Sequence, residues 1–256
     1  MEVDNYELTG KYWTRNFLLM GIPRSGTSLF VKILNKITGI HCFNETWYDV
    51  VTLAGFFTNS RLEIMNGRPV ENKFDNNGNY TEDTLLEENK QKELVEWSND
   101  LVLGLKANET FLFHINRLIY NTFLCYGLIR HPVYTMGSWN APKSEGTLNV
   151  YNIDTDSRYN DFNLKGNKLE MQAQLWDYYS RSFLSYREHM PVLRYEDWTA
   201  NPTEALKEFA TEFGVVIPQI EPFENMNKDG RYDNLDEIRK VVKKHCKSAK
   251  KWGYEI

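Results

Sequence analysis

Residues 17–28 read FLLMGIPRSGTS, and this stretch decides the fold. Its first four residues form a short, uninterrupted apolar run that stops at Gly21, as expected of a parallel strand buried on both faces. From Ser28 to Ile37, apolar side chains recur on one face of a helix. The sequence therefore predicts a strand, a glycine-containing turn and a helix in direct succession.

Further strands and helices are predicted to alternate along the rest of the chain. Apolar or β-branched runs predict strands at 40–43, 101–106, 123–129 and 192–195. Helical patterns occur at 81–99, 169–189, 203–213 (with Gly214 as a C-cap) and 235–251. Such alternation favours the α/β class, as a P-loop-type three-layer α/β/α fold around a central, mainly parallel sheet of about five strands.

The composition is typical of a globular protein, with 256 residues, 41% apolar and 25% charged. We expect a single domain over residues 1–256, because no linker or repeat interrupts it. Residues 57–80 and 140–168 are polar and rich in Asn and Gly. They are predicted to be mostly loops that frame a binding pocket.

The charge and the cysteines limit the partners and the compartment. A net charge of −5 disfavours nucleic acid as the main partner. We expect no membrane span, because no apolar run approaches the required length. The N-terminal residues lack the basic-then-apolar layout of a signal peptide. Three cysteines without a CxxC motif predict neither a disulfide framework nor a zinc site, which fits a reducing cytoplasm.

The turn after the first strand has the spacing of a phosphate-binding loop. Residues 21–28 fit G-x-x-x-x-G-x-[ST], and amides at a helix start bind anionic oxygens. The lysine of the nucleotide-kinase version is absent, because Thr27 takes its place and Arg24 supplies the cation. Two other strand ends offer Lys106 and Arg130 rather than the acids that hold Mg²⁺. The residues therefore favour a phosphosulfate donor neutralised by protein cations, without a metal. An ordinary strand–turn–helix is the alternative.

Three motifs together resemble the sulfotransferases that use PAPS, 3′-phosphoadenosine 5′-phosphosulfate. Residues 21–28 (GIPRSGTS) look like that family's 5′-phosphosulfate loop, and residues 129–139 (IRHPVYTMGSW) look like its 3′-phosphate motif. Residues 193–198 (LRYEDW), followed by Asn201-Pro202, resemble its late-strand segment. The resemblance covers residues 17–214 in family order. It implies metal-independent transfer of a sulfuryl group from PAPS to a hydroxyl or amine, with release of PAP.

The resemblance also implies which residues bind the donor. The 5′-phosphosulfate would be bound by Pro23, Arg24, Ser25, Gly26, Thr27 and Ser28. Arg130 and Ser138 would hold the 3′-phosphate, and Tyr195 would contact the adenine unless it belongs to the core.

Catalysis is assigned by the same resemblance to Arg24, Lys106 and Glu45. Arg24 would stabilise the leaving group, and Lys106 would lie near the sulfuryl group. Asn108 stands where small-phenol sulfotransferases often carry a histidine base. Glu45 is therefore the expected base, with His41 and His114 as rivals.

The pattern of Arg24 and Glu45 resembles the carbohydrate and tyrosyl-protein branches more than the small-phenol branch. We therefore expect an acceptor hydroxyl on a carbohydrate or a peptide. Two other functions stay open at this point: a P-loop nucleotide kinase and a catalytically silent PAP-binding module.

Overall fold

A five-stranded sheet forms the centre of the computed structural model, which describes residues 15–44, 53–68, 88–97, 100–120, 123–141, 160 and 162–256. The strands lie in the order β2-β3-β1-β4-β5, and all four pairings between them are parallel. Their bounds are β1 (Asn16–Gly21), β2 (Ile40–Asn44), β3 (Val102–Lys106), β4 (Leu124–Ile129) and β5 (Val192–Arg194). The α/β fold with a parallel sheet of five strands, predicted from the sequence, is confirmed.

Burial on both faces explains why the strands read as continuous apolar runs. Every residue of β1, β2 and β3 is buried. Along β1, Phe17 and Leu19 belong to one core cluster, whereas Leu18 and Met20 belong to the other. Successive side chains of a strand point to opposite faces, so both faces need apolar residues.

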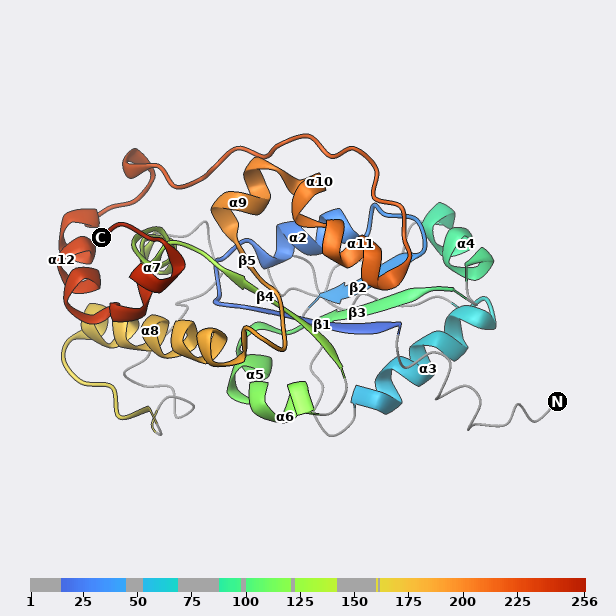
Figure 1. Cartoon of the computed structure of the whole chain (residues 1–256), viewed down its shortest axis with the longest axis horizontal. Coiled ribbons are helices and arrows are strands. Elements are labelled where there is room, and N and C mark those ends of the chain that lie inside the picture. Colours follow the sequence, from blue (N-terminus) through green and yellow to red (C-terminus); the bar gives the residue numbers. More distant parts are fainter. Residues whose placement is uncertain are drawn as a thin grey trace.

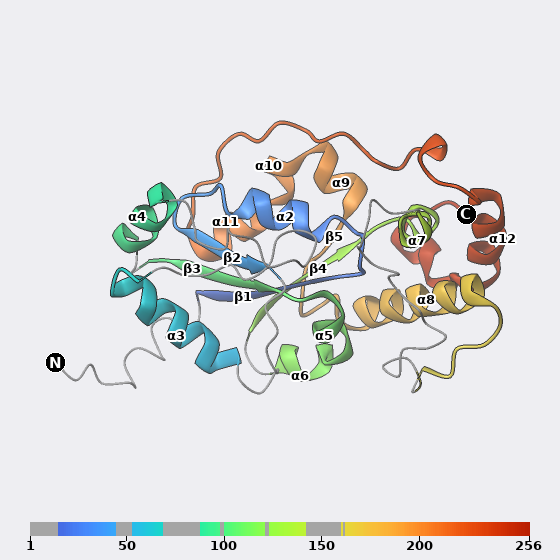
Figure 2. The ribbon, with the colours of Figure 1, turned by 180° about the vertical axis from the view of Figure 1, so that it is seen from behind.

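Helices cover both faces of the sheet and make the three layers (Figures 1 and 2). On one face lie α2 (Thr27–Leu34), α9 (Tyr195–Ala200), α10 (Pro202–Ala205) and α11 (Lys207–Phe213). On the other lie α3 (Leu53–Met65), α5 (Asn108–Phe113), α6 (Ile115–Tyr120) and α8 (Lys168–Tyr186). The remaining helices are α4 (Glu88–Glu96), which contacts α3, and α7 (Pro132–Asn140) and α12 (Leu235–His245), which contact each other and α8. Two 3₁₀ turns, η4 (Asp229–Arg231) and η5 (Lys247–Trp252), flank α12.

The segment that joins α11 to α12, residues 214–234, crosses the outside of one helical layer, and we call it the strap. Figure 1 shows it passing over α10 and α9 before it reaches η4. Its backbone is tied to those helices, because the Ile220 amide donates to the Thr203 hydroxyl (2.9 Å) and the Phe223 amide donates to the Thr199 carbonyl (2.8 Å). The strap thus has a defined course although it contains no strand or long helix.

One sequence prediction is wrong in its first half. Residues 57–80 were expected to be mostly loop, but α3 runs to Met65. The buried Arg61 obscured this helix in the sequence, since a charged residue interrupts the apolar face. It is buried because its guanidinium donates to the Leu101 carbonyl (2.8 Å) and to Asn16 Oδ1 (3.0 Å). Residues 69–80 lie outside the described residues.

Other boundaries differ from the prediction by a few residues. The first helix ends at Leu34 rather than Ile37, and the fifth strand ends at Arg194. The predicted helix at 203–213 is divided at Leu206, and it ends as expected at Gly214, with a φ of 62°. The predicted loop 140–168 lies mostly outside the described residues. Among the described helices, none combines the length and apolar character that a membrane span requires.

Gly104 in β3 should be intolerant of any side chain. A Cβ atom there would overlap the ring of Phe17, which the rings of Phe209 and Phe213 confine at 5.1 and 5.7 Å between centroids. We expect Gly104→Ala to lower the free energy of unfolding by about 2–3 kcal/mol, as measured by urea denaturation. Gly55→Ala in α3 is the matched control, because a Cβ there meets nothing within 4 Å. It should raise stability by about 0.5–1 kcal/mol, and equal losses in the two variants would contradict this account.

Candidate functional site

The loop between β1 and α2 is anchored to the neighbouring strand β4. The Ile22 amide and the Ser25 hydroxyl both donate to the Leu128 carbonyl, at 3.0 and 3.2 Å. The Ser25 amide closes a turn onto the Ile22 carbonyl at 2.9 Å. Arg24 has a φ of 68° and Gly26 a φ of 85°, so the loop passes twice through the left-handed region. A tightly wound loop of this kind exposes backbone amides to a ligand.

Gly26 leaves the start of α2 open to an anion. It has no side chain to cap the helix, and the first intrahelical bond runs from the Phe30 amide to the Gly26 carbonyl (3.0 Å). The amides of Thr27 and Ser28 therefore have no acceptor within the helix. Glycine is also required by space, since a Cβ at this position would lie 2.8 Å from the ring of Tyr195 and 3.0 Å from that of Trp198.

Arg24 and Ser138, which come from different motifs, meet in the structure. Arg24 Nε donates to Ser138 Oγ at 2.9 Å. Ser138 lies on α7 and is buried, whereas Arg24 is exposed. The next residue on α7, Trp139, donates from its indole to the Pro23 carbonyl at 3.0 Å. The first and second sequence motifs thus form one continuous surface.

Arg130 follows β4 directly, and its guanidinium is a hub of hydrogen bonds although it is only 5% exposed. Nη1 donates to the Arg24 carbonyl at 3.1 Å, which ties the hub to the loop. Nε donates to Asn227 Oδ1 at 2.7 Å, and Nη2 donates to the Met226 carbonyl and the Tyr232 hydroxyl, both at 3.1 Å. The guanidinium therefore joins the loop to the strap.

Tyr195 packs against the guanidinium of Arg130 and contacts the strap. The Arg130 guanidinium lies over its ring at 4.6 Å, and its hydroxyl accepts from the Met226 amide at 3.3 Å. The ring is buried and also contacts Trp198 edge-on. The observed contacts of Tyr195 are thus with the protein core, and its contact with adenine stays a prediction.

Lys106 brings a buried positive charge to the end of β3. The residue is only 1% exposed, and its Nζ lies 3.5 Å from Ser28 Oγ at the start of α2. In the sheet, Lys106 pairs with Leu19 of β1 and with Asn44, the last residue of β2. The cation is therefore close to the anion-accepting end of the helix.

Of the three candidate bases, the structure describes His41 and His114. Glu45, which follows β2, lies outside the described residues. His41 is fully buried, and its ring meets the ring of Phe43 edge-on at 4.5 Å. Burial, with a smaller effect of the Lys90 charge, lowers the pKa of His41 from 6.5 to about 3. A ring enclosed in the core does not reach an acceptor, so the structure gives His41 no role as the base. His114 ends α5, and no described contact joins it to the loop.

Four residues of this site escaped the sequence reasoning as functional candidates: Glu196, Met226, Asn227 and Tyr232. Glu196 accepts from the His131 amide (3.0 Å), from Asn227 Nδ2 (2.7 Å) and from the Tyr254 hydroxyl (3.1 Å). It belongs to the third motif, which was the available signal for it. No sequence pattern marked Met226, Asn227 and Tyr232 as functional, because the irregular strap has no hydrophobic periodicity and matches no motif. Within the described ranges, no three His, Cys, Asp or Glu side chains gather as they would around a metal ion.

Comparisons with known proteins return structures but no sequence match. No protein-family model and no curated protein matches the chain. Similar solved structures include a sulfotransferase from Alicyclobacillus acidocaldarius, with 14% identity, 94% of this chain and 96% of that chain covered, and a TM-score of 0.47. The sulfotransferase domain of a Synechococcus olefin synthase has 14% identity, 94% coverage of both chains and a TM-score of 0.45. A Mycobacterium avium sulfotransferase has 13% identity, coverage of 94% and 78%, and a TM-score of 0.44. The functional argument therefore rests on the residues of the site.

The buried His41 makes a prediction about pH. Its folded-state pKa lies below its unfolded value, so the unfolded chain binds the extra proton. Stability should therefore fall as the pH drops below 6.5, by about 1.4 kcal/mol per pH unit from this residue alone, until about pH 3. Urea unfolding of the wild type and of His41→Leu between pH 7 and pH 5 measures the difference. The variant should lose less stability than the wild type on acidification, and equal slopes would show that His41 does not contribute.

Proposed function

We propose that the chain is a sulfotransferase that uses PAPS as its donor and releases PAP. The observation that carries the proposal is the junction of two motifs: Arg24 Nε donates to Ser138, and Arg130 donates to the Arg24 carbonyl. The loop motif and the second motif, which the resemblance assigns to opposite ends of one nucleotide, are thus in direct contact. A nucleotide with phosphates at its 5′ and 3′ positions matches two such anion sites.

The residues present fit the donor in charge and in the hydrogen-bond donors that they offer. The uncapped start of α2 offers backbone amides to a 5′-phosphosulfate. Arg130 is a nearly fully buried cation whose described hydrogen-bond acceptors are all neutral, and a buried charge is stabilised by an ion of opposite sign. Lys106 adds a second buried positive charge 3.5 Å from Ser28 Oγ at the start of α2. Ser138 and Arg130 are proposed to receive the 3′-phosphate.

In the proposed reaction, the chain orients two substrates and neutralises the charge that moves between them. PAPS supplies an activated sulfuryl group: the acceptor oxygen bonds to sulfur while the sulfur–oxygen bond to the 5′-phosphate breaks, and its electron pair stays on PAP. Arg24 stabilises this leaving oxygen, and Lys106 neutralises the sulfuryl oxygens. Glu45 is proposed to take the proton of the acceptor hydroxyl.

The acceptor class and the setting are part of the proposal. The choice of Arg24 and Glu45 favours a hydroxyl on a carbohydrate or a peptide, by resemblance to those branches of the family. We further propose a single cytoplasmic domain of the P-loop type, in which the polar segments 57–80 and 140–168 contribute to the acceptor site.

Ligand stabilisation separates the proposed function from a nucleotide kinase. A ligand that binds only the folded chain raises its melting temperature in proportion to affinity and concentration. PAP should raise Tm without Mg²⁺ and more than ATP does. Stabilisation by ATP only in the presence of Mg²⁺ would replace the proposal with a kinase. A PAP-dependent shift without turnover of PAPS across hydroxyl acceptors would indicate the silent binding module.

Arg24 should be essential for turnover through its guanidinium rather than through its backbone. We expect Arg24→Ala to lower kcat by about 10²–10³-fold, the usual cost of removing a group that stabilises transition-state charge. Arg24→Gly is a matched variant, because glycine adopts the φ of 68° without strain. The two variants should be equally inactive in a PAPS turnover assay. Recovery of activity in the glycine variant would assign Arg24 to loop conformation instead.

A further inference from the structure

Asn227, on the strap, has both polar atoms of its side-chain amide in hydrogen bonds. Asn227 Oδ1 accepts from Arg130 Nε at 2.7 Å, and Asn227 Nδ2 donates to Glu196 Oε1 at 2.7 Å. An arginine cannot accept a hydrogen bond and a carboxylate cannot donate one. Only one orientation of the amide satisfies both partners, so Asn227 holds the Nε edge of Arg130 in a single direction.

Glu196, the anchor of this arrangement, is itself held by two further donors. It accepts from the His131 amide at 3.0 Å and from the Tyr254 hydroxyl at 3.1 Å. Burial raises the pKa of Tyr254 far above its usual range, so its hydroxyl remains a donor. The carboxylate is therefore held by two donors outside the strap, and it gives Asn227 a fixed partner.

These contacts decide which part of Arg130 is left for a ligand. An arginine has five N–H donors. In the described part of the chain, the strap takes the Nε donor and both Nη2 donors, and the Arg24 carbonyl takes one donor of Nη1. One Nη1 donor is left, on the group that also contacts the loop. The donor available to an anion is thus on the nitrogen of the guanidinium that contacts the β1–α2 loop.

The end of the strap is seated on α7, next to Ser138. The ring of Tyr232 lies against Gly137, where a Cβ would come within 2.9 Å of Tyr232 Cγ. The hydroxyl of Tyr134, also on α7, donates to Asp229 at 3.0 Å. Packing and a hydrogen bond therefore fix the end of the strap on α7, the helix that carries Ser138.

We infer that Asn227 is a positioning residue that aligns Arg130 and thereby sets the preference of the site for nucleotides with a 3′-phosphate. This inference rests on the proposed function. Asn227 acts through Arg130 and touches no substrate atom itself. Its effect therefore concerns the 3′-phosphate, whereas the proposed ligands of the 5′-phosphate are in the loop at residues 23–28.

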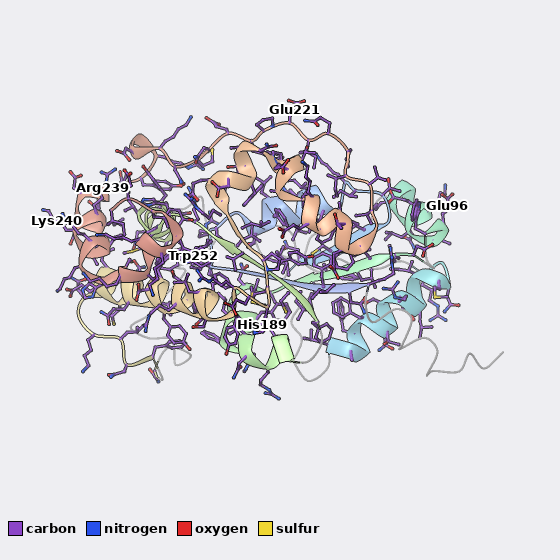
Figure 3. The ribbon with its side chains drawn as sticks, in the orientation of Figure 1. Glu96, His189, Glu221, Arg239, Lys240 and Trp252 are labelled. Atoms are coloured by element: carbon purple, nitrogen blue, oxygen red, sulfur yellow. The ribbon has the colours of Figure 1, made fainter. Side chains whose placement is uncertain are left out.

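The test compares PAP with AMP, which lacks the 3′-phosphate, by isothermal titration of the full chain. Asn227→Ala should weaken PAP binding by about tenfold, the cost of a misaligned charge-assisted contact, and leave the Kd of AMP unchanged. Tyr232→Phe removes one hydrogen bond to Arg130 Nη2 and keeps the aromatic ring on Gly137. It should therefore raise the Kd of PAP relative to that of AMP, but by less than Asn227→Ala does. Glu221→Gln is the control on the same strap, because Glu221 is exposed and points away from the body of the molecule (Figure 3). It should leave both affinities unchanged.

The outcomes separate this inference from the proposed function. A wild-type chain that binds PAP no tighter than AMP would overturn the proposed donor site and the inference with it. A wild-type preference for PAP that persists in Asn227→Ala and Tyr232→Phe would overturn the inference alone. Equal weakening of PAP and AMP in Asn227→Ala would show a general structural role and would also overturn it. If Asn227→Ala does not fold, the ratio of the PAP and AMP dissociation constants of Tyr232→Phe decides: a ratio equal to that of the wild type would overturn the inference.

Discussion

The hydrogen bonds of the Arg130 guanidinium hold together the segments that build the candidate site. The guanidinium lies at the end of a buried strand, where the sheet presents its carboxyl edge. From there it reaches the β1–α2 loop through the Arg24 carbonyl and the strap through Asn227. A planar group with donors on three sides can join three segments at once, which a lysine ammonium in the same place does not do with comparable geometry.

Burial of positive charge is the second constraint. Lys106 and Arg130 are almost completely removed from water at neighbouring parts of the same edge. For Arg130, the described hydrogen-bond partners that offset part of this cost are neutral oxygens, among them the Met226 carbonyl and the Tyr232 hydroxyl. Neutral acceptors compensate a buried cation less well than an anion does. An edge built in this way is electrostatically prepared for an anionic ligand.

The sequence predicted the parts of the molecule that depend on local patterns. The five strands followed from uninterrupted apolar runs, and the loop with its two glycines followed from its position between a strand and a helix. The helix α3 was missed because Arg61, on its apolar face, donates to two distant acceptors that no local pattern reveals, the Leu101 carbonyl and Asn16 Oδ1. The contacts of Arg130 with the strap could not be predicted for the same reason, since they join an extended segment to a strand end. Tyr195 shows an intermediate case: the motif left open whether it contacts adenine or belongs to the core, and in the structure it is buried against Trp198 and Arg130.

The strap has a consequence for the order in which the site forms during folding. The bond between Arg130 and Asn227 closes a separation of 97 residues, and the bond between Arg24 and Ser138 closes one of 114. Contacts this distant along the chain are slow to form, because the entropy of loop closure precedes any gain from the contact. During synthesis the strands β1 to β4 and the β1–α2 loop emerge well before the strap. The β1–α2 loop can therefore exist for some time before Arg130 is joined to the strap, so the candidate site is completed late in folding.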